Sequence, residues 1–73
     1  MPIYKFEETV KEIAGEKGMS LFGSHTDLLW QIKKDLESRE ISADEVPEKM
    51  KENKDFRLNF SRDDFETIVK AIK

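Results

Sequence analysis

The chain contains 73 residues, enough for one domain spanning residues 1–73, and its lack of cysteine excludes disulfides, thiolate metal sites and thiol chemistry. Charged residues of mixed sign make up 40% of the chain, and the net charge of -3 describes a small acidic protein whose charge alone selects no class of partner. No segment resembles a signal peptide or reaches the roughly 18 apolar residues of a membrane span, so we expect a soluble, cytoplasmic protein without a membrane partner.

The first predicted helix extends from about Phe6 to Lys17. Its apolar residues recur at positions i, i+4, i+7 and i+8, which form one face of a helix: Phe6, Val10, Ile13 and Ala14. Gly15 and Gly18 are expected to end this helix, because glycine readily adopts the left-handed conformation that closes helices. Residues 19–23 then form an apolar linker.

The second predicted helix extends from about His25 to Arg39. Ser24 is expected to cap it, with Asp27 in the place that glutamate usually takes in a capping box. Four apolar residues fall within a stripe of about 100°, the width of a face that packs against a core: Leu28, Leu29, Ile32 and Leu36. This stripe is therefore expected to face the core.

The third predicted helix is short, from about Glu45 to Glu52, and Pro47 decides where it starts. If Ser42 capped the helix, Pro47 would stand at the fifth helical position, where it removes a hydrogen bond and clashes with the preceding turn at a cost of about 3 kcal/mol. If Asp44 caps it, Pro47 stands in the first turn, where its missing N–H is not needed. We therefore expect Asp44 to be the cap.

Residues 56–60 alternate apolar and polar side chains, which is typical of a strand, and residues 3–6 show a similar alternation. An isolated pair of strands is marginally stable. An extended apolar loop is therefore preferred, and a minor two-stranded pairing of residues 3–6 with 56–60 is left open.

The last predicted helix begins after Ser61. Phe60 and Phe65 stand at the positions of a hydrophobic staple around that cap, and two acids in the first turn complement the positive end of the helix dipole. Taken together, the elements predict an all-α fold, a small bundle of three to four short helices.

Catalytic residues are not expected. His25 is the only histidine, and a surface position in the first turn of a helix is the simplest account of it. Ser20, Ser24 and Thr26 are the hydroxyls near it in sequence, but no third group stands at a spacing that would orient a nucleophile and a base. No metal-binding or phosphate-loop motif is present. We predict a protein that is not an enzyme and binds no cofactor, with an enzyme of unrecognised site as the minor alternative.

A nucleic-acid-binding role is the first alternative. The short connection at residues 40–43 is compatible with a helix-turn-helix, and basic residues follow it: Lys49, Lys51, Lys54, Arg57 and Arg62. Duplex binding needs a basic face, yet acidic residues are interleaved with the basic ones: Glu48, Glu52, Asp55, Asp63 and Asp64. Residues 48–64 therefore carry no net charge, and nucleic-acid binding ranks second.

The segment from Thr26 to Ile72 resembles the FF domain: a helix, the motif Asp44-Glu45-Val46 opening another, Asp55-Phe56-Arg57 after it, and a last helix. It is similarly close to the DEK carboxyl-terminal domain. Both are small helical interaction or nucleic-acid modules, so the resemblance implies a helical binding module. No functional residue is carried over, because the aromatic of the first FF helix has no counterpart here unless Trp30 serves, and Trp30 lies off the apolar stripe.

Trp30 is the most informative residue for function. It lies roughly 100° beyond the nearest edge of the apolar stripe, between Lys34 and Glu37 on the helical wheel. We expect Trp30 and Phe22 to be buried, because an exposed tryptophan weakens a thin core; exposed, they would be anchors for a partner. The prediction is a non-catalytic protein–protein interaction or regulatory module of unknown partner, a homodimer being one option. Its candidate contact residues are Trp30, Lys34, Glu37 and Phe22.

Overall fold

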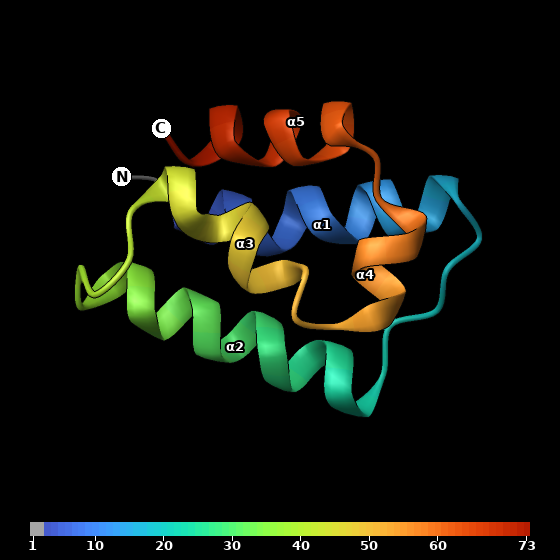
Figure 1. Ribbon diagram of the computed structural model, residues 1–73, viewed down its shortest axis with the longest axis horizontal. Helices are drawn as coiled ribbons and strands as arrows, with labels where there is room; N and C mark the ends of the chain where they lie inside the picture. Colours follow the sequence, from blue (N-terminus) through green and yellow to red (C-terminus); the bar gives the residue numbers. More distant parts are fainter. Residues whose placement is uncertain (1–2) are drawn as a thin grey trace.

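A computed structural model describes residues 3–73 of the chain, and within that range the fold is all-α, with no strand (Figure 1). The helices are α1 (Tyr4–Glu16), α2 (Gly23–Glu37), the 3-10 turn η1 (Ala43–Glu45), α3 (Val46–Met50), α4 (Lys54–Asn59) and α5 (Arg62–Ile72). The predicted fold class is confirmed. The minor pairing of residues 3–6 with 56–60 is wrong, because α1 begins in the first segment and α4 occupies most of the second.

The first and last helices pack side by side. The most extensive contact between elements joins α1 to α5, and α3 contacts both α2 and α5. Figure 1 accordingly shows α1 between α5 and α2, with α3 in front of it. Every helix contributes to the apolar core, whose larger members are Phe6, Val10, Ile13, Leu29, Ile32, Leu36, Ile41, Val46, Met50, Phe56, Phe60, Phe65, Ile68 and Ile72.

Gly18 ends α1. Its backbone has a φ of 69°, the left-handed region in which a side chain is strained. The Gly18 N–H donates to the Gly15 carbonyl (3.1 Å) and the Met19 N–H to the Ala14 carbonyl (2.8 Å), the paired bonds of a Schellman motif. Gly15 lies inside the helix, so only one of the two predicted stop residues acts as one.

The N-terminus of α2 differs from the prediction. The helix begins at Gly23 with Phe22 as its N-cap residue, so the capping box of Ser24 with Asp27 is wrong. Beyond the last residue of α2, Arg39 adopts the left-handed conformation (φ 65°). The N–H groups of Arg39 and Glu40 donate to the carbonyls of Leu36 and Asp35, which is again the pair of bonds of a Schellman motif.

The 3-10 turn η1 precedes α3, so that Pro47 lies in the first turn of the α-helix. Ser42 is the N-cap residue of η1 and Glu45 is the N-cap residue of α3, so the predicted cap Asp44 is wrong. The Ser42 N–H donates to Glu45 Oε1 (3.4 Å). The helix α3 then starts at Val46, with Pro47 in its first turn as expected. The change from a 3-10 turn to an α-helix allows Ser42 to cap the turn while Pro47 still avoids the helix interior.

The segment predicted as extended forms the short helix α4. Asn53 caps it, because its side-chain oxygen accepts the N–H groups of Asp55 (2.9 Å) and Phe56 (3.3 Å). The alternation at residues 56–60 also fits a helix, since Phe56 and Phe60 are four residues apart and both buried, while Leu58 is exposed.

The start of α5 is as predicted. The Ser61 N–H donates to Asp64 Oδ2 (2.8 Å) and the Asp64 N–H donates to Ser61 Oγ (3.2 Å). The rings of Phe60 and Phe65 pack at 5.8 Å between centroids, which confirms the hydrophobic staple. Among residues 3–73, no helix is long and apolar enough to cross a membrane.

Candidate functional site

The candidate site is the side of α2 that faces away from the core, and it consists of Trp30, Lys34 and Glu37. We call these three residues the α2 outer face. The Trp30 side chain is 59% exposed, so its predicted burial is wrong. Successive residues of a helix are turned by about 100°, so Trp30 points away from the core as its neighbour Leu29 points into it.

Lys34 lies against the exposed indole. Its Nζ is 4.5 Å from the Trp30 ring centroid, a cation–π contact across one helical turn. Glu37 is exposed and continues the same stripe one turn further, seven residues after Trp30 and three after Lys34. The structure therefore brings Trp30 and Lys34 together and places Glu37 beside them.

Phe22 is separate from the α2 outer face. Its side chain is 64% exposed, contrary to the predicted burial, and its ring packs edge-on against that of His25 at 5.0 Å between centroids. It precedes Trp30 by eight residues, about 12 Å along the helix axis. Phe22 therefore lies at the N-terminus of α2, against the His25 ring and apart from the α2 outer face.

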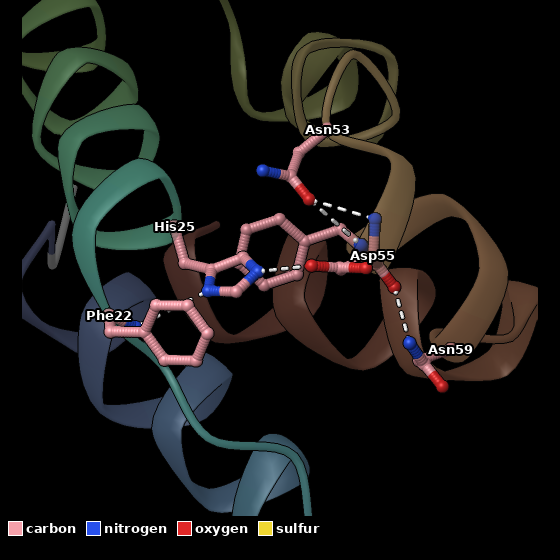
Figure 2. A network of polar contacts seen from close by, with 6 residues as sticks. Phe22, His25, Asn53, Asp55 and Asn59 are labelled. Carbon is pink, nitrogen blue, oxygen red and sulfur yellow. Dashed lines mark hydrogen bonds and ion pairs between the residues drawn. The ribbon is translucent and has the colours of Figure 1, made fainter.

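His25 is buried, contrary to the predicted surface position: it is 2% exposed. Its Nδ1 accepts the N–H of Phe22 (3.3 Å) and its Nε2 lies 2.7 Å from Asp55 Oδ2 (Figure 2). Because Nδ1 is an acceptor, we assign the ring proton to Nε2, which donates to the carboxylate. Both ring nitrogens are thus occupied by structural hydrogen bonds.

Periodicity is the signal that could have found this burial. His25 stands at the start of the series i, i+4, i+7 and i+11 that continues through the buried residues of α2: Leu29, Ile32 and Leu36. Its ring also packs on Phe56 of α4 at 5.4 Å between centroids. His25 therefore joins the first turn of α2 to α4.

The polar contacts around Asp55 hold α4 in place. The Asp55 N–H donates to the side-chain oxygen of Asn53. The Asp55 carbonyl accepts from the Asn59 side-chain amide (2.8 Å), and its carboxylate accepts from the His25 ring (Figure 2). A helix of six residues is too short to be stable by itself. The contact of His25 with Asp55 thus helps to fix the orientation of α4 against α2.

An ion pair joins the C-terminal end of α1 to α5. Lys17 Nζ lies 2.7 Å from Asp64 Oδ2, beside the cap of α5. Burial raises the pKa of Asp64, but the hydrogen bonds from Lys17 and Ser61 and the charge of Lys17 outweigh it, so the pKa is lowered from its ordinary value of 3.8. The ionised carboxylate therefore stabilises the packing of the two helices.

Residues 3–73 contain no group of three or more His, Cys, Asp or Glu side chains placed to hold a metal ion. Comparison with known proteins yields no match to a protein-family model, to a curated protein or to a solved structure. The resemblance of residues 26–72 to the FF domain therefore assigns no family, and the function has to be inferred from the residues of the chain itself.

Proposed function

We propose that the chain is a non-catalytic protein–protein interaction module that contacts its partner through the α2 outer face. The observation that supports this proposal is the 59% exposure of Trp30 on a regular helix whose opposite side is fully packed. The indole is not needed to close the core, so its exposure to water serves no purpose in the fold. Tryptophan is among the residues most enriched at the energetic centres of interfaces.

The surroundings of the indole suit this role. The cation–π contact with Lys34 restricts the ring before a partner arrives, and restricting a side chain in advance lowers the entropic cost of binding. Lys34 and Glu37 place one charge of each sign beside the ring. The expected partner surface is an apolar pocket for the indole, bordered by polar groups that match these two charges.

Nucleic-acid binding remains the alternative, and the geometry of α3 ranks it second. A helix-turn-helix places its second helix in the major groove, and here that helix would be α3, which has five residues. Three glutamates on and next to α3 line one surface hollow there: Glu45, Glu48 and Glu52. Carboxylates at this place repel the phosphates on which duplex affinity depends.

The test is affinity capture from the lysate of the native host with immobilised wild-type protein and a Trp30→Ala variant, followed by mass spectrometry. Tyr4→Ala is the matched control, because Tyr4 is an equally exposed aromatic residue (63%) on α1. We expect a protein that is captured by the wild type and by Tyr4→Ala, with or without nuclease, and is lost with Trp30→Ala. Capture that survives Trp30→Ala would contradict the proposal, and capture that nuclease abolishes would favour the alternative.

A further inference from the structure

A groove between α3 and α5 is a second surface of interest, and none of its lining residues belongs to α2. Its volume is about 310 Å³. Pro47, Phe65 and Val69 form an apolar floor. Charged side chains form the rim: Asp44, Lys51, Arg62, Glu66, Lys70 and Lys73.

The rim of this groove is positive although the chain as a whole is negative. Four basic side chains face two acidic ones, a net charge of +2, in a protein of net charge -3. Two other surface hollows have the opposite sign. The one beside η1 and α3 has four acidic residues and one basic residue, and the one between Ile3 and the end of α2 has three acidic residues and one basic residue.

The two acidic residues of the rim are already paired within the chain. Lys73 Nζ lies 2.7 Å from Asp44 Oδ1, and Arg62 Nε lies 3.5 Å from Glu66 Oε1. Within residues 3–73 no ion pair involves Lys51 or Lys70. Two positive charges without an internal counter-ion therefore border the apolar floor.

Lys51 is held over that floor. Its Nζ lies 5.4 Å from the ring centroid of Phe65, a cation–π contact that keeps the ammonium group over the floor of the groove. Phe65 itself is buried, so too little of its ring is exposed for a nucleic-acid base to stack on it. Val69 and Pro47 are half-buried, so they leave apolar surface uncovered in the groove that the two lysines also line.

We propose that this groove binds an acidic peptide segment of a partner protein, with one large apolar side chain on the floor and carboxylates beside Lys51 and Lys70. The volume lies at the lower end of the range for ligand pockets, about 300–1,000 Å³, which suits one or two side chains of a peptide. The apolar floor offers nothing to a phosphate backbone, and the positive rim disfavours a purely apolar occupant. This site shares no residue with the α2 outer face. The binding role proposed for one surface can therefore be disproved without affecting the role proposed for the other.

The probe is a short fluorescein-labelled peptide with phenylalanine and leucine at its centre and glutamates on both sides, measured by fluorescence anisotropy. Two control peptides replace the glutamates by glutamines or the apolar pair by serines. We expect the acidic apolar peptide to bind, and to bind more weakly as salt screens the lysines. Each control peptide should bind at least about tenfold more weakly. In ¹⁵N NMR spectra the shifted amides should belong to η1, α3 and α5.

Variants of the protein complete the test. Lys51→Glu combined with Lys70→Glu should reduce affinity for the peptide at least about tenfold, whereas Lys5→Glu combined with Lys54→Glu, an equal change of charge outside the groove, should not. Lys51→Gln with Lys70→Gln, which removes charge without reversing it, should give an intermediate loss. Circular dichroism checks that all variants fold, and Trp30→Ala should bind the peptide as the wild type does.

Four results would overturn the proposal: no binding of the acidic apolar peptide, equal binding of the glutamine peptide, unchanged binding by the folded double glutamate variant, or shifted amides on α2. A single-stranded RNA that displaces the peptide from the groove would also overturn it, in favour of a nucleic-acid site.

Discussion

The two faces of α2 differ in a way that reverses the usual rule for burial. The inner face includes His25, a polar residue that is almost fully buried, and the outer face includes Trp30, the largest side chain of the protein, which is mostly exposed. His25 is accommodated because both of its ring nitrogens have partners. The position of a residue relative to the helical period decided its burial here, and its hydrophobicity did not.

Ile32→Ala tests the inner face and has the largest expected effect. Ile32 is 1% exposed and lies at the centre of that face. Loss of the side chain should lower the free energy of unfolding by about 2–5 kcal/mol, measured in urea melts. Such a loss is enough to unfold a small domain, so Ile32→Val, with an expected loss of about 0.5–1.5 kcal/mol, is the milder companion. Negligible losses in both would place α2 in a different orientation.

His25→Ala should cost less but still distinguish the two faces. It removes both hydrogen bonds of the ring and leaves the Phe22 N–H without its partner, so we expect a loss of about 1–3 kcal/mol in urea melts. Thr26→Ala, at the next residue on the exposed side, should change stability by no more than about 0.5 kcal/mol. Equal effects of the two substitutions would show that His25 is not a buried link to α4.

Asp64 extends the comparison to a polar residue outside α2. Its pKa is lowered in the folded protein, so the ionised carboxylate stabilises the fold above the ordinary value of 3.8, and this contribution is lost as the pH falls through the lowered pKa. In urea melts at a series of acidic pH values, the wild type should lose stability more steeply than Asp64→Asn. At neutral pH this variant should be less stable by about 0.5–1 kcal/mol. Asp63→Asn should lose stability with falling pH as steeply as the wild type does. If Asp64→Asn also loses stability that steeply, the acid sensitivity does not come from Asp64.

Trp30→Ala should have the smallest effect on stability, within about 0.5 kcal/mol, as for ordinary surface substitutions. The emission of the wild-type indole should lie near that of the unfolded chain, and iodide should quench it readily, because the ring faces water. A blue-shifted emission, or a loss of stability as large as that of Ile32→Ala, would place the indole in the core and remove the basis of the proposed function.

Local signals were predictable from the sequence, and contacts between distant segments were not. The cap and staple of α5 depend on Phe60, Ser61 and Phe65, which are neighbours in the chain, so their spacing was sufficient. The predicted burial of Trp30 required a second helix to cover the outer side of α2, and Trp30 is exposed. The apolar periodicity identifies the side of α2 that packs on the core, but it does not tell whether another helix also covers the opposite side. The rule that large apolar residues lie inside holds only on average.

The groove illustrates the same limit for charge. Residues 48–64 sum to zero along the sequence, which concealed any basic surface. Folding brings Lys51, at the C-terminal end of α3, and Lys70, in the last turn of α5, to the same groove, although the two residues are far apart in the chain. Helix α4 was missed for a related reason: an apolar residue at every second position of a short segment fits a strand and also one turn of a helix, and Asn53 as the cap decides between them.

The packing of α1 on α5 also has a consequence for the order of events during synthesis. The first helix buries Phe6 and Val10, yet its most extensive contact is with the last helix of the described chain. A nascent chain that has emerged only as far as α4 lacks this cover, so its first helix still exposes apolar surface. Contacts between such distant segments also slow folding, because a long loop has to close before they form. We therefore expect the chain to reach its native state only after α5 has left the ribosome, and to be most prone to aggregation just before that point.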